Sequence, residues 1–383
     1  MPKTSTLVLV GTRKGLFMLR ADKSRAKWWI EGAKPQFYGQ QVNHAVLNKA
    51  TGTLIAAAKP GHIGAQVYRS TDGGKTWAEA KVPPAFPKQP TENPGYGWAV
   101  NHVFWISPGH ASMPKTWFAG TSPHGLFRSD DDGVTWASVD GFNLHPLRLT
   151  LLGDEKENVP DGAVLHSINV DPFDAKHIML GMSGGGVFET FDEGKTWTPL
   201  NRGVQADFLP DPEAEYGHDP HCLRMHATVK DVVYHQNHCG IYKLDRAAAG
   251  GNVRWMRIGD NMPKAIGDIG FNMTLHPKDP NKLWVFPMDG TTVWPRVSLE
   301  GKPAAYGSSD GGKSWKRLDK GLPKSHGWFT VKRQAMSADQ ADPLGLYFGT
   351  TGGEIWASFD EGAKWNCLMQ HLPMALSVEA YSL

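Results

Sequence analysis

One eight-residue pattern recurs along the chain and limits its fold more than any other feature. The pattern is Ser/Thr-x-Asp-x-Gly-x-x-Trp, as in STDGGKTW. Successive copies lie 59, 61, 118 and 50 residues apart, measured between central aspartates, and the longest interval is close to two periods. A chain that repeats one unit at this period folds as an array of similar units. The central aspartates of the five clean copies are Asp72, Asp131, Asp192, Asp310 and Asp360.

Two further copies of the pattern are degenerate. The stretch Tyr242 to Trp255 (YKLDRAAAGGNVRW) lies in the long interval, with Asp245 in an expanded turn. The stretch Leu19 to Trp28 (LRADKSRAKW) precedes the first clean copy by one period. The sequence therefore predicts seven units.

Each copy has the chemistry of a tight turn between two strands. The aspartate accepts backbone N–H groups across the turn, the glycine supplies a positive φ, and the tryptophan packs between neighbouring units. A glycine-containing turn and a short strand precede most copies, as in GTSPHGLFRS (120–129). Seven four-stranded units of 50 to 60 residues predict an all-β chain that folds as a seven-bladed β-propeller.

The pattern resembles the repeat of Asp-box (BNR) proteins, and the resemblance spans nearly the whole chain. This family includes sialidases, xyloglucanase-type glycosidases, sortilin-like receptors and photosystem assembly factors. The chain is most similar to bacterial cytoplasmic proteins that are usually labelled BNR or sialidase-like repeat proteins. The resemblance implies a propeller with Asp-box turns. It implies no reaction, because the box is a structural element.

The chain termini are predicted to close the ring. The first unit lacks its innermost strand, and Met374 to Leu383 (MALSVEAYSL) can supply it. The predicted blades cover about residues 5–30 with 374–383, 43–80, 101–139, 165–200, 221–258, 270–318 and 330–368, in a single domain of residues 1–383.

Bulk composition argues against several classes of partner. The net charge is +2, and no run of lysine and arginine forms a stripe for a nucleic acid backbone. The N-terminal apolar run, Leu7 to Val10, is too short for a signal peptide or a membrane span. Three cysteines make no disulfide framework, so we expect a cytoplasmic protein.

A histidine recurs near the start of the predicted innermost strands. The tripeptide VNH occurs twice, ending at His44 and His102, and the next two blades place His166 and His221 in register. Four neutral imidazoles around one axis form a ligand set suited to iron, zinc, copper or manganese. The alternative is that they only fill the channel. The last blades place Phe271, Arg333 and Val378 or Glu379 at this position.

Other polar residues are predicted to lie on the same face. Three long loops, 83–100, 141–165 and 203–220, are candidates for lids or substrate walls. A carboxylate near His221 is a candidate base. The candidate substrate-binding residues are Arg13, Lys14, His62, His124 and Trp328, and the candidate catalytic residues are Glu213, Asp219, Arg333 and His238.

Three functions remain open from the sequence. The first is a metal-dependent hydrolase, lyase or oxygenase that acts on a small polar or anionic substrate at the axial histidines. The second is a sialidase-like glycosidase, although the chain has no RIP-type arginine motif and its aligned axial positions are histidines rather than paired carboxylates. The third is a non-catalytic binding or assembly propeller. The oligomeric state cannot be read from the sequence.

Overall fold

A computed structural model describes residues 4–61, 64–87, 98–151, 163–247, 252–290 and 296–383. The chain divides into two compact units, one of residues 43–223 and one of residues 1–42 with 224–383. Within the described residues, the strands form seven four-stranded antiparallel sheets, so the chain is a seven-bladed β-propeller, as predicted. In these residues no helix is long and apolar enough to span a membrane.

The unit of residues 43–223 is built around three sheets in chain order. The long connection after the second sheet carries two short helices, α1 (Asp140–Asn143) and α2 (Pro146–Thr150), where we expected only a loop. The sheets are β4 (Gln41–Asn48), β5 (Thr53–Lys59), β6 (Gln66–Ser70) and β7 (Ala78–Glu79); β8 (His102–Pro108), β9 (Trp117–Ser122), β10 (Gly125–Ser129) and β11 (Ala137–Ser138); and β12 (Leu165–Val170), β13 (Ile178–Met182), β14 (Gly186–Thr190) and β15 (Thr198–Pro199).

The other unit is built around the remaining sheets, except that Pro220 to Leu223, the first part of β16, belong to the unit of residues 43–223. Two 3₁₀ turns, η1 (Gly259–Asn261) and η2 (Leu299–Gly301), lie in its connections. The sheets are β16 (Pro220–Met225), β17 (Val232–Asn237), β18 (Gly240–Asp245) and β19 (Met256–Arg257); β20 (Gly270–Leu275), β21 (Leu283–Pro287), β22 (Ala305–Ser308) and β23 (Lys316–Leu318); β24 (Met336–Ala338), β25 (Leu346–Gly349), β26 (Ile355–Ser358) and β27 (Asn366–Met369); and β28 (Ala375–Ser382), β1 (Thr4–Thr12), β2 (Gly15–Asp22) and β3 (Trp28–Ile30).

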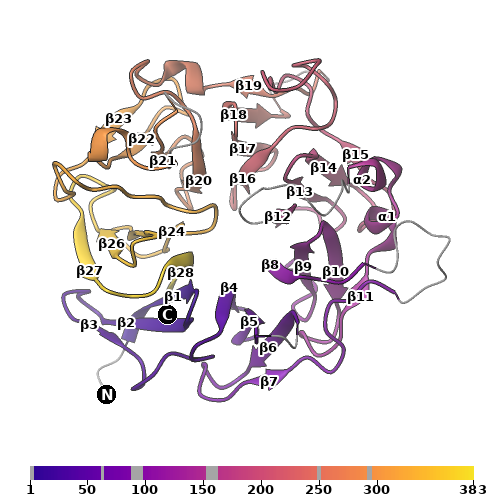
Figure 1. The fold of residues 1–383 in the computed structure, drawn as a ribbon, viewed down its shortest axis with the longest axis horizontal. Coiled ribbons are helices and arrows are strands. Elements are labelled where there is room, and N and C mark those ends of the chain that lie inside the picture. The colour runs from indigo at the N-terminus through magenta and orange to yellow at the C-terminus, as the bar shows by residue number, and fades with distance from the viewer. Residues whose placement is uncertain (1–3, 62–63, 88–97, 152–162, 248–251, 291–295) are drawn as a thin grey trace. The chain divides into compact units, whose positions relative to one another are not determined.

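The chain termini meet in the last of these sheets, as predicted. The C-terminal strand β28 runs antiparallel to β1 and lies beside it (Figure 1). Their register extends from Thr6 opposite Ser382 to Thr12 opposite Ala375. Pairing between strands so far apart in sequence joins the two ends of the chain without a covalent link.

The second strand of the third sheet, β13, is buried on both faces, which explains its apolar sequence. Every residue of β13 (IMLGM) is buried. Apolar side chains of neighbouring sheets mix in one cluster that contains Phe118, Leu180 and Phe188. The box tryptophan Trp197 belongs to the same cluster, so the repeated motif contributes directly to the packing between sheets.

The Asp-box turn has the hydrogen bonds that its sequence predicts. In the copy after β14, Asp192 accepts bonds from the hydroxyls of Thr190 and Thr196, and the indole N–H of Trp197 donates to the carbonyl of Gly194 at 3.0 Å. The Thr196 hydroxyl and N–H lower the pKa of Asp192 to about 2. The stability that this carboxylate contributes is therefore present above pH 3.8 and lost as the pH falls through about 2.

One degenerate copy keeps the same turn. Asp22 accepts bonds from the hydroxyl of Ser24 and the N–H of Ala26, and the indole of Trp28 donates to the carbonyl of Arg25 at 2.8 Å. The tryptophan again bonds the residue three places before it. The other degenerate copy includes residues 248–251, which lie outside the described residues.

The residue after the box aspartate connects neighbouring sheets. At this position the backbone φ is positive, which favours glycine or a small polar residue. Where the residue is acidic it bonds the preceding sheet, as in Arg128 with Glu193 and Lys282 with Glu361. Asp132 is the most buried example, with 7% exposure.

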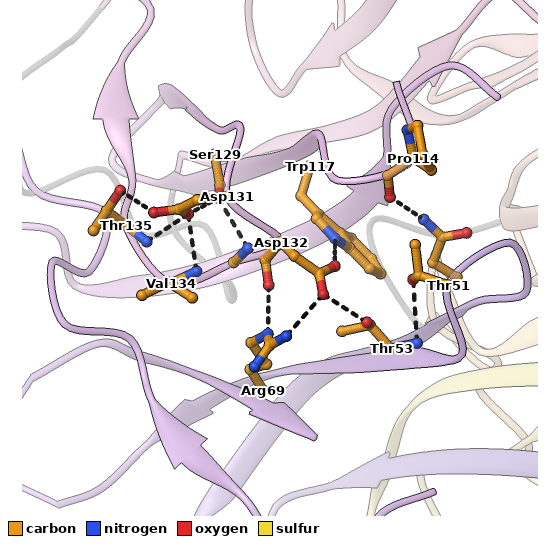
Figure 2. Close-up of polar contacts among 12 residues, drawn as sticks. Thr51, Thr53, Arg69, Pro114, Trp117, Ser129, Asp131, Asp132, Val134 and Thr135 are labelled. Carbon is orange, nitrogen blue, oxygen red and sulfur yellow. Dashed lines mark hydrogen bonds and ion pairs between the residues drawn. The ribbon is translucent and has the colours of Figure 1, made fainter. Parts of the chain in front are cut away.

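Four hydrogen bonds converge on Asp132 (Figure 2). Its carboxylate accepts the Thr53 hydroxyl at 2.8 Å, the Arg69 guanidinium at 2.9 Å and the Trp117 indole at 3.1 Å. Its carbonyl accepts a further bond from Arg69. Thr53 and Arg69 belong to β5 and β6, so this one side chain ties two neighbouring sheets together.

We expect Asp132→Asn to destabilise the fold by about 3 kcal/mol, because an amide cannot accept all three side-chain donors and leaves Arg69 without its carboxylate. Asparagine tolerates a positive φ, so backbone strain does not confound the measurement. The matched control is Asp130→Asn, since the Asp130 side chain is 62% exposed and its ion pair is worth about 1 kcal/mol or less. Urea unfolding measures the free energy of unfolding of both variants. Equal losses of this free energy in the two variants would contradict the role of Asp132 in joining the sheets.

Candidate functional site

Aromatic rings lie close to the three histidines on the first strands of the unit of residues 43–223. The Trp105 ring centroid is 5.1 Å from that of His44 and 6.4 Å from that of His166. The Phe104 ring centroid is 6.0 Å from that of His102 and 6.4 Å from that of His166.

Hydrogen bonds give two of these histidines a structural role. Nδ1 of His44 accepts the N–H of Ile106 in the next sheet at 3.0 Å. Nε2 of His166 contacts the carbonyl of Pro220 at 2.9 Å, and its Nδ1 contacts the hydroxyl of Ser167 at 2.8 Å. A metal would displace these bonds. The four-histidine metal site therefore stays a prediction, and His44 and His166 have another explanation.

The fourth histidine forms a different kind of contact. His221 lies at the start of β16, and its Nε2 is 3.1 Å from Oδ2 of Asp219. The His221 side chain is 2% exposed and that of Asp219 is 26% exposed, so the pair is buried but open to solvent on the carboxylate side. Asp219 and His221 are among the described side chains whose ligand atoms are close enough to hold a metal ion.

His124 lies near this pair, in the turn between β9 and β10. Its Nε2 contacts the carbonyl of Ser183, in the turn between β13 and β14, at 2.8 Å. Burial and the charge of Arg148 lower the pKa of His124 to about 3, while Asp219 acts in the opposite direction. His124 is therefore neutral near pH 7. It does not contribute to a cationic site.

Arg148 is a buried residue of this region that the sequence did not single out. It projects from α2 and is fully buried, and burial lowers its pKa to about 10. Its guanidinium donates to the carbonyls of His124 and Asn143, and it lies 5.1 Å from the ring centroid of Phe86. These bonds fix the turn that carries His124. The signal available in the sequence was an arginine in the apolar stretch PLRLT.

Four further predicted residues lie in loops and turns. Glu213 is exposed, and its N–H donates to Asp211. Arg13 and Lys14 are exposed in the turn between β1 and β2. His238 is partly buried in the turn between β17 and β18.

The last predicted site residues are Trp328, Arg333 and His62. Trp328 is 58% exposed. Arg333 lies 5.1 Å from the ring centroid of Phe271. His62 lies outside the described residues. Among the predicted residues of the unit 43–223, the structure brings together His124, Asp219 and His221.

Comparisons with known proteins agree with the fold. A family model described as BNR/Asp-box repeat matches residues 68–79. A comparison with curated protein sequences finds no match. The GH74 enzyme of Niastella koreensis is similar in structure, with 16% identity and a TM-score of 0.61 over 94% of this chain. The match covers 51% of the GH74 chain, so this chain spans about half its length.

Two further similar structures match over nearly their whole length. One is the periplasmic gluconolactonase of Pseudomonas aeruginosa, with 14% identity, a TM-score of 0.56 and coverage of 98% of each chain. The other is a putative 6-phosphogluconolactonase from Bacteroides uniformis, with 9% identity, a TM-score of 0.54 and coverage of 98% of this chain and 99% of that chain. At these identities the likeness shows the fold alone.

We expect the pKa values of two buried histidines to be shifted in opposite directions. His124 stays neutral from about pH 8 to 5, because its pKa is about 3. Burial lowers the pKa of His177, but bonds to Glu189 and Asp171 raise it above 6.5 overall. His177 therefore contributes stability that is complete below pH 6.5 and lost as the pH rises through its raised pKa. The His124 contribution is lost as the pH falls from 6.5 toward 3.

NMR titration of the histidine ring signals measures both pKa values, with His124→Gln and His177→Gln supplying the assignments. The stability of His124→Gln should depend less on pH between about 6.5 and 3 than that of the unsubstituted protein. A His124 signal that titrates near pH 6.5 would contradict the buried, neutral ring.

Proposed function

We propose that this chain, an Asp-box (BNR) repeat β-propeller, is a metal-dependent hydrolase of small polar substrates with Asp219 and His221 at its centre. The contact between these two side chains carries the proposal. It joins a carboxylate oxygen and an imidazole nitrogen, which are the donor types that zinc, iron and manganese bind in proteins. The box itself is structural and has no part in the reaction.

The spacing of the two atoms fits a shared metal ion. Metal–nitrogen and metal–oxygen bonds of about 2.1 Å place two ligands of one ion about 3 Å apart. Oδ2 of Asp219 and Nε2 of His221 are 3.1 Å apart. The same distance allows a hydrogen bond, in which Asp219 would hold one tautomer of the ring. A bound divalent ion would supply an activated water at neutral pH.

The surrounding residues position this pair and define its chemistry. Pro220 separates Asp219 from His221, and its carbonyl contacts Nε2 of His166, which anchors the start of β16 to the preceding sheet. His124 supplies a neutral ring beside the carboxylate. Arg148 holds the backbone of His124, and Asp219 is exposed enough for a substrate to reach.

A sugar lactone is the substrate class that we favour. One similar structure is a gluconolactonase, and that chain matches this one over 98% of both lengths. A lactone ring is a small polar carbonyl compound that water can open when a general base or a metal ion activates it. This likeness supports the proposal only as an analogy of fold.

The first test is the metal content of tag-free protein, because a histidine tag would itself bind metal. We expect about one equivalent of a divalent transition metal, lost in Asp219→Asn and His221→Gln. The matched control is Glu213→Gln, in the same loop and exposed. His44→Gln would lose the metal only if the four-histidine prediction holds. A metal-free folded protein would overturn the metal proposal.

The second test is hydrolysis of glucono-δ-lactone, followed by acid release. We expect kcat/KM to fall by about 10²–10⁴ in Asp219→Asn and His221→Gln, and to be unchanged in Glu213→Gln. Equal activity in all four proteins would overturn the assignment of the site. Turnover of an aryl glycoside in place of the lactone would favour a glycosidase instead.

A further inference from the structure

Two buried polar atoms, one on His124 and one on the residue whose carbonyl His124 contacts, have no hydrogen-bond partner in the described part of the chain. They are Nδ1 of His124 and Oγ of Ser183. His124 is 1% exposed. Because unpartnered buried polar atoms are costly, each such atom calls for a ligand, a water molecule or a structural reason.

The geometry fixes which nitrogen of His124 carries the proton. Nε2 lies 2.8 Å from the carbonyl of Ser183, and a carbonyl oxygen can only accept. Nε2 must therefore carry the hydrogen, and Nδ1 presents a lone pair. The two unpartnered atoms thus differ in kind: His124 Nδ1 accepts only, whereas the Ser183 hydroxyl can donate or accept.

An unpartnered Nδ1 is not by itself a binding site. His145 has the same arrangement, with Nε2 at 3.1 Å from the carbonyl of Trp197 and Nδ1 without a partner. Two features distinguish His124 from His145. The charge of Asp219 acts on His124, and the carbonyl to which His124 donates belongs to Ser183, whose own hydroxyl lacks a partner.

We propose that His124 Nδ1 and the Ser183 hydroxyl form a subsite for the hydroxyl groups of a neutral polyhydroxylated substrate. One substrate hydroxyl donates to Nδ1, and a different hydroxyl of the same substrate accepts from Ser183. This inference rests on the proposed function, which places the reacting bond at Asp219 and His221. Of the polar and anionic substrates that the sequence left open, it favours the polar class, because an acceptor nitrogen offers an anion no hydrogen bond.

The first experiment compares two lactones of the same ring size, glucono-δ-lactone with its hydroxyls and δ-valerolactone without them. We expect Ser183→Ala and His124→Phe each to lower the ratio of their kcat/KM values about 10-fold, with δ-valerolactone little affected. Ser183→Ala leaves the Ser183 carbonyl in place and so preserves the bond from His124. The Ser183→Ala variant therefore still tests the proposal if His124→Phe fails to fold. The matched control is His145→Gln, which should leave the ratio unchanged.

The second experiment measures binding without catalysis. D-Glucitol, a neutral polyol, is titrated into ¹⁵N-histidine-labelled Asp219→Asn protein, with δ-valerolactone as the probe that lacks hydroxyls. We expect D-glucitol to move the His124 Nδ1 resonance and to leave that of His145 in place. Ser183→Ala should weaken this binding several-fold.

The outcomes separate the subsite from the proposed function. A shift of His124 by D-glucitol without lactone hydrolysis would keep the subsite and overturn the hydrolase. Lactone hydrolysis with an unchanged substrate ratio and no shift of His124 would overturn the subsite and keep the hydrolase. In that case a buried water molecule satisfies both atoms.

Discussion

The fold depends on buried polar side chains that cross from one sheet to the next. A propeller blade buries both faces, so each polar atom on those faces needs a partner in a neighbouring sheet. Asp132 meets this need with donors from β5 and β6, and His44 meets it with the N–H of Ile106. Asn43 does so as well, donating to the carbonyl of Val103 at 2.9 Å. Apolar packing holds the sheets together, and these bonds fix their register.

This constraint explains the repeated tripeptide VNH. In the first copy, Asn43 and His44 both bond the strand that follows the second copy. In the second copy, Asn101 accepts a hydrogen bond from Lys59 of the preceding sheet, and the ring of His102 contacts that of Phe104. The two copies of the tripeptide therefore contact different neighbouring residues. Repetition of a residue in a repeat protein reports a shared position, and its partners decide whether that position is structural or functional.

The sequence predicted the architecture well because the box is local. Asp192, Gly194 and Trp197 form their turn from bonds within eight residues, so the spacing of the boxes predicts the blades. The closing strand β28 was predictable because one strand was missing from the first blade. The site was only partly predictable, because its contacts join residues far apart in sequence. Asp219 and His221 are two residues apart and were both singled out as candidates, whereas Arg148 reaches the backbone of His124 across 24 residues.

The electrostatics of this region could not be predicted from the sequence for the same reason. Arginine and histidine side chains suggest a cationic surface when only residue types are counted. In the structure, Arg148 directs its donors to backbone carbonyls, and burial keeps His124 neutral. What these residues offer a ligand is therefore hydrogen-bond geometry rather than positive charge. The proposed site, with a carboxylate, an accepting imidazole and a hydroxyl, would bind hydroxyl donors and metal cations. Both fit a hydrolase of neutral sugars better than they fit an enzyme that recognises anions.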